Sequence, residues 1–217
     1  MNIALDNVSF SYNKKTPVIR ELNYTFNSGA NYVLTGANGS GKTTLTKLIA
    51  GIIRPDSGQI IMGGEDIKKK SLSDISSFIG YLFQNPDHQL FAGTVREELT
   101  FPYEITGTLD NIIDKKIDEV IEKFNLKPLE NRFPLTLSGG EKQKLALATL
   151  FIRDIRFLVL DEPYSAIDKE GRAFLSALLN EFVSAGGGAL IITHDLENIG
   201  DLNCAVRLNM EGGRIET

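Results

Sequence analysis

The segment from Gly36 to Thr43 has the residue types and the spacing of a loop that binds phosphate groups. It fits the pattern G-x-x-x-x-G-K-[ST]. Glycines let backbone N–H groups close around phosphate oxygens, a lysine reaches the outer phosphates, and a threonine hydroxyl binds Mg²⁺. A short apolar strand (32–35) before the loop and a helical pattern after it direct the positive end of a helix toward the anion. The flanking pattern therefore favours a nucleotide-phosphate site at Lys42 and Thr43 over a glycine-rich turn with an exposed lysine.

Two carboxylates, Asp161 and Glu162, follow an apolar run (157–160) that is typical of a strand covered on both faces. Ligands of open parallel sheets bind at this end of the strands. Asp161 is predicted to hold Mg²⁺, directly or through water, and Glu162 to orient and polarise an attacking water. Alone, the pair would be better explained as a helix cap or as solvated charges. The phosphate-binding loop makes the catalytic interpretation the stronger one.

The segment Leu137-Ser138-Gly139-Gly140-Glu141 precedes a helical pattern. Ser138 and Glu141 have the spacing of a capping box, which satisfies the free backbone donors at a helix start. Two consecutive glycines at that point also leave the backbone N–H groups exposed and allow an anion to approach them closely. A purely structural cap does not require this. Both a cap and an anion contact therefore remain open for Ser138.

The elements that must position these residues alternate along the chain. Two antiparallel strands are expected at residues 3–12 and 18–26, and further strands at 32–35, 79–83, 157–160 and 190–193. Helices are expected after the glycine loop, over 111–124, from Ser138 to Ile152, and around Phe174 to Val183, the last ended by the glycines at 186–188. Alternating strands and helices predict an α/β fold with a parallel sheet.

Composition narrows the function classes. The chain has 217 residues, 42% of them apolar, and a formal charge of -5, so an ordinary globular domain is expected and nucleic acid is a poor first guess for a partner. The single cysteine, Cys204, cannot form an intramolecular disulfide and is expected to be a small core residue in a reducing cytosol. No secretory signal and no run long enough to span a bilayer is visible, so a membrane role is expected to require a partner.

Six motifs appear in an order that resembles the ATP-binding-cassette (ABC) ATPases. They are the glycine loop at 36–43, Gln84, the LSGGE segment at 137–141, the strand and carboxylates at 157–162, the segment 165–168, and His194. The resemblance covers nearly the whole chain. It implies a P-loop NTPase fold with a parallel core sheet, an N-terminal antiparallel β subdomain and an inserted helical subdomain at about 85–155. Residues 1–217 would form a single ABC ATPase domain.

The same resemblance implies the cofactors ATP and Mg²⁺ and a role for each site residue. ATP would be contacted by Tyr12, Asn38, Gly39, Ser40, Gly41, Lys42, Thr43 and Thr44, and from the opposite subunit by Ser138, Gly139, Gly140 and Glu141. Catalysis would fall to Lys42, Gln84, Glu162 and His194, and Mg²⁺ to Thr43, Gln84 and Asp161. Asp168 would bridge the two subunits. Lys144 departs from the arginine that is often found at its position, which puts an ion pair expected there in doubt.

A finer resemblance involves the segments 84–91 and 94–98, which look like those of energy-coupling-factor importers. It implies partners: a second ABC ATPase subunit, the same or homologous, a transmembrane coupling protein and a substrate-binding membrane protein. The chain would then lie peripherally on the cytoplasmic face of the cell membrane, and the cargo would be a vitamin or a transition-metal ion. Leu90 and Phe91 are expected either to anchor the coupling protein or to pack inside the helical subdomain.

Two other functions compete with transport. A soluble ABC ATPase of DNA repair or translation is the main alternative, but the repair class carries long heptad insertions and the ribosomal class joins two cassettes in one chain. A P-loop kinase would leave the LSGGE segment and His194 without a role. The sequence therefore favours an ATPase that drives a membrane transporter.

Overall fold

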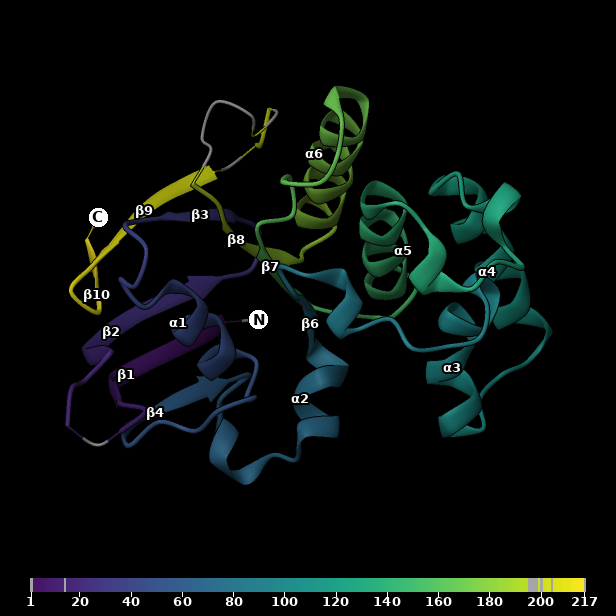
Figure 1. The fold of residues 1–217 in the computed structure, drawn as a ribbon. Helices are drawn as coiled ribbons and strands as arrows, with labels where there is room; N and C mark the ends of the chain where they lie inside the picture. Colours follow the sequence, from purple (N-terminus) through teal and green to yellow (C-terminus); the bar gives the residue numbers. More distant parts are fainter. Residues whose placement is uncertain (1, 14, 195–198, 200, 204, 217) are drawn as a thin grey trace.

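Two β-sheets frame the molecule in the computed structural model, which describes residues 2–13, 15–194, 199, 201–203 and 205–216 (Figure 1). The smaller sheet is antiparallel and has the order β2-β1-β4-β5. Its strands are β1 (Asn2–Phe10), β2 (Ile19–Asn27), β4 (Ser57–Met62) and β5 (Glu65–Asp66). The N-terminal antiparallel pair predicted from the sequence is confirmed, and β4 completes a sheet that the sequence pattern did not reveal. Cys204 lies outside the described residues.

The larger sheet has the strand order β10-β9-β3-β8-β7-β6. Its strands are β3 (Asn31–Thr35), β6 (Ile79–Leu82), β7 (Phe157–Asp161), β8 (Gly188–Ile192), β9 (Ala205–Glu211) and β10 (Arg214–Glu216). All neighbours pair in parallel except β9 and β10, which form an antiparallel hairpin. The parallel α/β core predicted from the sequence is confirmed. Because parallel strands end at one edge, the residues after β3, β7 and β8 meet there.

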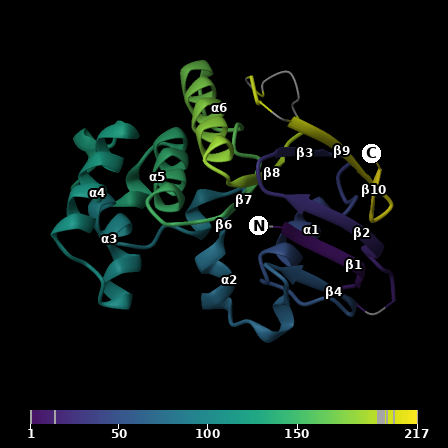
Figure 2. The same ribbon diagram turned by 180° about the vertical axis from the view of Figure 1, so that it is seen from behind.

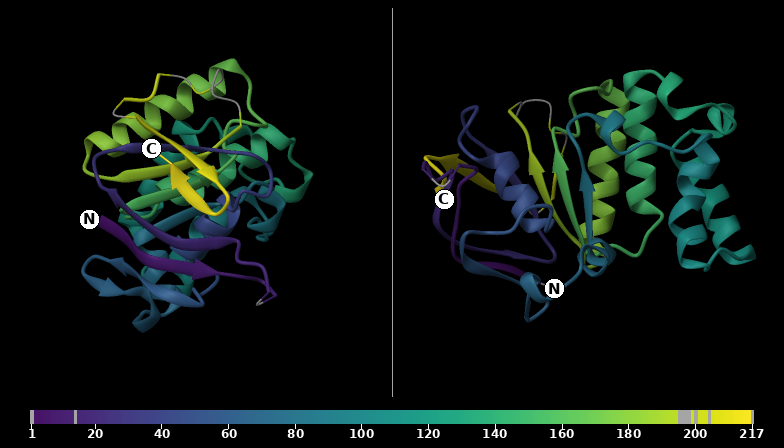
Figure 3. Two further views of the ribbon diagram at one scale, coloured as in Figure 1. Left: turned by 90° about the vertical axis from the view of Figure 1, so that its left-hand side faces the viewer. Right: turned by 60° about the horizontal axis from the view of Figure 1, so that its bottom comes forward.

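Side chains of β7 alternate between two cores on opposite faces of the larger sheet. Phe157 and Val159 pack with helix α1 (Lys42–Ile49) and with the antiparallel sheet. Leu158 and Leu160 pack with helices α5 (Gly139–Phe151) and α6 (Lys169–Ser184). The right panel of Figure 3 shows α1 between the two sheets and α5 and α6 on the far side. Burial on both faces explains why this strand is a continuous apolar run.

The helical part of the chain lies beyond the β6 end of the larger sheet, as the opposite views of Figures 1 and 2 show. It contains α3 (Val95–Thr106), α4 (Asn111–Lys123) and α5, and helix α2 (Leu72–Phe78) precedes it. Short 3-10 helices lie at Ile67–Lys69, Pro86–His88, Lys127–Leu129 and Pro134–Thr136. No helix in the described part of the chain has the length and apolar character that crossing a membrane requires.

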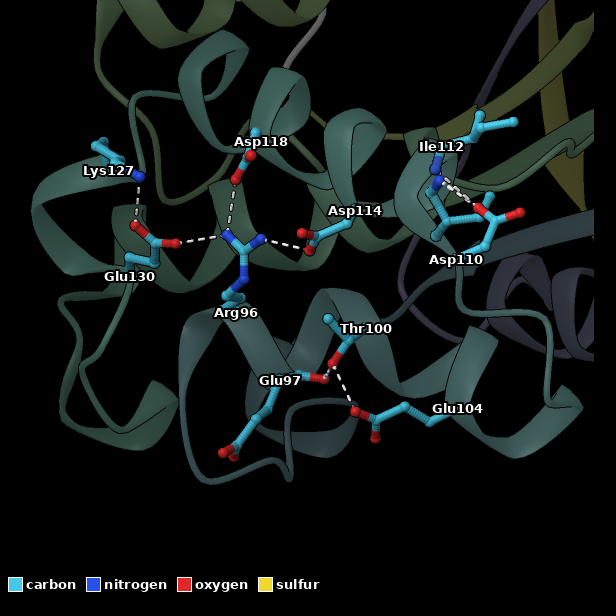
Figure 4. A network of polar contacts seen from close by, with 11 residues as sticks. Arg96, Glu97, Thr100, Glu104, Asp110, Ile112, Asp114, Asp118, Lys127 and Glu130 are labelled. Atoms are coloured by element: carbon cyan, nitrogen blue, oxygen red, sulfur yellow. Dashed lines mark hydrogen bonds and ion pairs between the residues drawn. The ribbon is translucent and has the colours of Figure 1, made fainter.

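An ion-pair network joins α3 to α4 in this helical part (Figure 4). The Arg96 guanidinium lies 2.6 Å from Asp114, 2.7 Å from Asp118 and 2.6 Å from Glu130. Hydrogen bonds from Arg96 lower the pKa of the Asp118 carboxyl, and Lys127 and Arg96 together lower that of Glu130. One planar cation that serves three carboxylates fixes the crossing of α3 and α4 more firmly than separate exposed pairs would.

The predicted element boundaries are close to the observed ones. The helices expected over 111–124 and from Ser138 to Ile152 correspond to α4 and α5. The expectation that the glycines at 186–188 end a helix was wrong in one detail: α6 ends at Ser184, and Gly188 is the first residue of β8. A side chain at Gly188 would collide with the ring of Phe157 on the neighbouring strand, so the packing of β8 against β7 requires a glycine here.

Candidate active site

A cavity of about 360 Å³ opens where β3, β7 and β8 end. Its lining residues come from the N-terminal part of the chain, the glycine loop, Gln84, the carboxylates after β7 and the end of β8. They are Tyr12, Val18, Asn38, Gly39, Gly41, Lys42, Thr43, Thr44, Gln84, Asp161, Glu162 and Ile192. Ten of these twelve were predicted to bind ATP or Mg²⁺ or to take part in catalysis, and the fold brings them to one edge of the sheet.

The loop between β3 and α1 has the backbone conformation that a phosphate cradle needs. Gly36, Gly39 and Gly41 have positive φ angles of 139°, 80° and 110°, which residues with a Cβ atom adopt only under strain. A Cβ atom at Gly36 would also collide with the carbonyl oxygen of Met210, because β9 passes directly beneath the loop. The glycines are therefore required both by the turn and by the close packing below it.

The loop offers donors that suit an anionic phosphate chain. Gly41 caps α1, and the first turn of this helix contains no acidic residue that would occupy its N–H groups. The Ser40 hydroxyl is buried and has no hydrogen-bond partner among the described residues. Lys42 Nζ donates to the carbonyl oxygens of Gly36 at 2.7 Å and Ala37 at 3.0 Å, which holds the ammonium at the loop. These groups fit the phosphates of a nucleotide.

Two oxygen ligands suited to Mg²⁺ lie side by side in the cavity. The Thr43 hydroxyl donates a hydrogen bond to Asp161 Oδ2 at 3.1 Å. Burial raises the pKa of the Asp161 carboxyl, and the hydrogen bond from Thr43 partly opposes that rise. Hydroxyl and carboxylate oxygens are the ligands that Mg²⁺ prefers, so the donor set fits this cation. Gln84, the third predicted ligand, lines the same cavity and is exposed.

Glu162 sits in an unusual backbone conformation directly after β7. Its φ angle is 52°, and its backbone N–H donates to the Ile192 carbonyl oxygen at 3.0 Å, at the end of β8. A glutamate rarely adopts this conformation, so the surrounding structure must hold it there. Its Oε1 atom lies 2.8 Å from His194 Nδ1. The two residues predicted for water activation and γ-phosphate contact are thus directly joined.

Tyr12 lies at the rim of the cavity and is 62% exposed. Its hydroxyl is 3.3 Å from Thr44 Oγ1, and its ring meets that of Phe10 edge-on at a centroid distance of 4.9 Å. These two contacts orient an aromatic face that remains open to solvent. That geometry suits stacking on a flat base, the role expected for this residue.

The residues assigned to an opposite subunit do not line this cavity. Ser138 caps α5: its N–H and hydroxyl donate to Glu141 Oε2 at 2.8 Å and 2.7 Å, and the capping box predicted from the sequence is confirmed. These hydrogen bonds lower the pKa of the Glu141 carboxyl. Gly139 faces open space, and Asp168 is an exposed residue that caps α6 through Gly171 N–H at 2.8 Å. The cap and a contact from a second subunit are compatible, because Ser138 is exposed.

Leu90 and Phe91, which the sequence treated as a pair, have different environments. Leu90 is 3% exposed and packs in the core of the helical part, so the expectation that it anchors a partner was wrong. Phe91 is 59% exposed and contacts the ring of Phe101 at a centroid distance of 4.5 Å. The buried carboxylate of Glu98 accepts the backbone N–H groups of Phe91 and Ala92 at 2.9 Å and 2.8 Å, and so fixes this turn.

Sequence reasoning missed several residues that build the site. Val18 and Ile192 line the cavity, but an apolar residue at a strand end carries no signal for such a role. The sequence put an ion pair at Lys144 in doubt and gave no signal for Lys142, which pairs with Asp87 at 2.8 Å and joins α5 to the segment after Gln84. Gln143, beside it, is 1% exposed and donates to the Pro163 carbonyl oxygen at 3.2 Å.

Comparison with known proteins agrees with a site that binds a nucleotide. The chain is 39% identical over 209 residues to the energy-coupling factor transporter ATP-binding protein EcfA1 of Thermotoga maritima, covering 96% of this chain and 79% of that protein. Its fold matches cbiO1 of Clostridium perfringens, part of the ABC transporter complex cbiONQ, with a TM-score of 0.85, 28% identity, and 99% and 86% of the two chains covered.

A second structure, the ATP-binding cassette MJ0796 bound to ADP and Pi, matches with a TM-score of 0.85 at 20% identity over 99% of this chain and 97% of that one. At that identity the match bears on the fold alone, which is the P-loop fold predicted from the sequence. The ABC transporter family itself matches residues 19–165. The chain therefore belongs to the ABC transporter family and is an ATP-binding, ATP-hydrolysing cassette.

Proposed function

We propose that this ATPase works as a dimer that closes on Mg-ATP and drives substrate movement through a separate transmembrane partner. The observation that carries the proposal is the division of the predicted site. One set of residues lines the cavity, whereas Ser138, Gly139, Gly140 and Glu141 lie outside it at the start of α5. An exposed serine and two glycines at a helix N-terminus suit the terminal phosphate of a nucleotide held by another subunit. Each ATP would then lie between two chains, with Asp168 at their contact.

Within one cavity the roles follow from the geometry. Lys42 and the loop N–H groups would hold the phosphates, and Tyr12 the base. Thr43, Asp161 and Gln84 would hold Mg²⁺, which supplies positive charge that offsets the developing charge on the phosphates. Glu162 would orient the attacking water and accept its proton, and His194 would hold the Glu162 carboxylate in place and contact the γ-phosphate. Catalysis here rests on positioning and charge stabilisation.

The membrane partners proposed are those of an energy-coupling-factor importer: a second ABC ATPase, a transmembrane coupling protein and a substrate-binding membrane protein. The similarity to EcfA1 and to a subunit of cbiONQ supports this assignment. The chain would lie peripherally on the cytoplasmic face of the membrane. The cargo would be a vitamin or a transition-metal ion. We further propose that residues 1–217 act as one ATPase domain whose helical insertion, about 85–155, touches the partner.

The decisive test is Glu162→Gln, which removes a charge and keeps the side-chain volume. The variant should bind ATP normally and lose roughly 1000-fold in turnover, because proton acceptance contributes on that order. With hydrolysis stalled, the closed dimer should accumulate, and light scattering should give twice the chain mass with Mg-ATP. A stalled variant that remains monomeric at saturating Mg-ATP and high protein concentration would reject the shared sites. Wild-type turnover in this variant would reject the role of Glu162.

A further inference from the structure

The first half of helix α5, from Gly139 to Ala146, contacts both loops that carry predicted catalytic groups of the same chain. On one side, Lys142 pairs with Asp87 at 2.8 Å, and Gln89 Nε2 donates to the Ala146 carbonyl oxygen at 3.4 Å. These contacts hold the segment that follows Gln84. On the other side, Gln143 Nε2 donates to the Pro163 carbonyl oxygen at 3.2 Å, directly after Glu162.

Gln143 is a buried glutamine, although glutamine is mostly an exposed residue in folded proteins. Its side chain is 1% exposed and is surrounded on α5 by the buried residues Leu145, Ala146 and Leu147. A buried amide is unfavourable unless it is hydrogen-bonded, and an apolar residue would fill this position without that requirement. The packing of α5 therefore does not explain a glutamine here, whereas a fixed link to Pro163 does.

The loop that receives this bond is itself tightly held around Glu162. The Ser165 hydroxyl donates to the Glu162 carbonyl oxygen at 3.0 Å, and the hydroxyls of the buried Tyr164 and of Ser176 are 3.1 Å apart. A Cβ atom at Gly140 would lie 3.1 Å from the Ala166 carbonyl oxygen, so α5 and this loop also meet backbone to backbone. A shift of α5 is therefore transmitted to the loop and cannot be absorbed by soft side chains.

We propose that Gln143 is a positioning residue for hydrolysis: it couples the start of α5, where Ser138 lies, to the backbone that aims the Glu162 carboxylate. Engagement of Ser138 at one ATP would then set Glu162 at the other. The inference rests on the assignment of Glu162 to the attacking water. Gln143 does not line the nucleotide cavity of its own chain, and it acts through its hydrogen bond to Pro163.

The main test is Gln143→Leu, which keeps the buried volume and removes the hydrogen bond. The expected result is a kcat about 10-fold lower, because small misplacements of a catalytic group cost one to two orders of magnitude. The KM for ATP and the affinity for ATP should stay near wild type, because the cavity lining is unchanged. Thr149→Val is the matched control: it removes a hydroxyl of the same helix that donates to the Ala146 carbonyl oxygen within α5, and it should keep full kcat.

A second variant gives a readout that a merely structural role would not move. In Gln143→Glu the introduced carboxyl can donate to the Pro163 carbonyl oxygen when it is protonated and repels that oxygen when it is ionised. Its kcat relative to wild type should therefore rise as the pH falls from about 8 to about 6, since burial raises the pKa of a carboxyl. A pH-independent ratio would overturn the proposed bond.

Other outcomes separate this inference from the proposed function. Wild-type kcat in Gln143→Leu, or an equal loss in Thr149→Val, would overturn the role of Gln143 while Glu162→Gln still stalls hydrolysis. A loss explained fully by a smaller folded fraction, with normal kcat per ATP-binding site, would also overturn it. If Glu162→Gln itself keeps wild-type turnover, the assignment of Glu162 and this inference fall together.

Discussion

The ammonium of Lys42 lies 2.7 Å from the carbonyl oxygen of Gly36, the first residue of its own loop. A second carbonyl, that of Ala37, accepts from the same nitrogen at 3.0 Å. The lysine is thus held across the mouth of the glycine loop, and its backbone is fixed at the start of α1. Because the Lys42 side chain is already held at the loop, it loses little conformational freedom when its ammonium binds a phosphate. A charge-assisted hydrogen bond is strong under that condition.

Lys42→Ala should therefore weaken ATP binding on the order of 100-fold, the amount that the loss of a charged hydrogen bond represents. Titration with a fluorescent nucleotide would measure it. Lys47→Ala is the control, because Lys47 lies in the last turn of the same helix and does not line the cavity. Unchanged affinity in Lys42→Ala would remove the assignment of the phosphate site.

Ser138→Arg should abolish turnover but leave ATP binding by the isolated monomer largely intact, because Ser138 does not line its own chain's cavity. ATPase assays and nucleotide titration would measure the two effects. Loss of the cap alone should cost about 1 kcal/mol of stability. Ser71→Arg is the matched control: Ser71 and Asp74 form the same capping box on α2, and its loss should lower stability while turnover per folded molecule stays normal.

A mixture of two inactive variants tests whether the sites are shared. In a dimer of Ser138→Arg with Lys42→Ala, one site combines an intact Lys42 with an intact Ser138, and the other site lacks both. Turnover should return on mixing if residues from two chains serve each ATP. A mixture as inactive as its components, in dimers shown to contain both variants, would favour a Ser138 that only caps its helix.

The sequence predicts most of the core because strong, local signals mark it. The apolar run of β7 and the amphipathic pattern of α4 both correspond to observed elements. In contrast, β4 and the hairpin of β9 and β10 were not anticipated. Their residues alternate only partly, and these strands depend on pairing with β1 and β3, which lie far away in the sequence. Long-range pairing of this kind is what a local pattern cannot report.

The candidate site was predictable where a residue type is tied to a motif. Lys42, Thr43, Asp161 and Glu162 were assigned from motifs, and the fold brings them together. Gln143 was missed because a glutamine in a helix is ordinarily a solvated residue, and only the fold shows it buried against Pro163. Leu90 and Phe91 looked alike in sequence, yet Leu90 packs in the core and Phe91 lies at the surface, a difference between neighbouring residues of one turn that no local pattern marks.

Glu98→Gln should stabilise the protein at pH 7. Burial raises the pKa of the Glu98 carboxyl, and the bonds from Ala92 and Phe91 only partly oppose it. The folded state therefore binds the proton more tightly than the unfolded state. The contribution of Glu98 to stability is lost as the pH rises from the ordinary glutamate pKa through the raised pKa of the folded state. The amide oxygen of glutamine can accept the same two N–H groups without a charge.

Urea unfolding of both proteins at pH 7 and pH 4 would measure the effect. The gain from Glu98→Gln should shrink at pH 4, where the wild-type carboxyl is protonated in the folded state. Glu97→Gln changes an exposed glutamate of the same helical turn and should give the same small difference at both pH values. A variant less stable than wild type at pH 7 would mean that the ionised hydrogen bonds outweigh burial.

Phe91→Ala should weaken assembly with the transmembrane partner and reduce substrate uptake in a reconstituted membrane complex, with near-normal ATP binding by the isolated subunit. The physical reason is that Phe91 presents a large apolar surface on a turn already fixed by Glu98, so little ordering is needed on docking. Ile112→Ala removes a comparably exposed apolar side chain from α4 and should leave assembly unchanged. Stability should change by less than about 0.5 kcal/mol in both variants. Intact assembly and uptake in well-folded Phe91→Ala would defeat the docking role, and equal losses in the two variants would point to a general effect of surface apolar area.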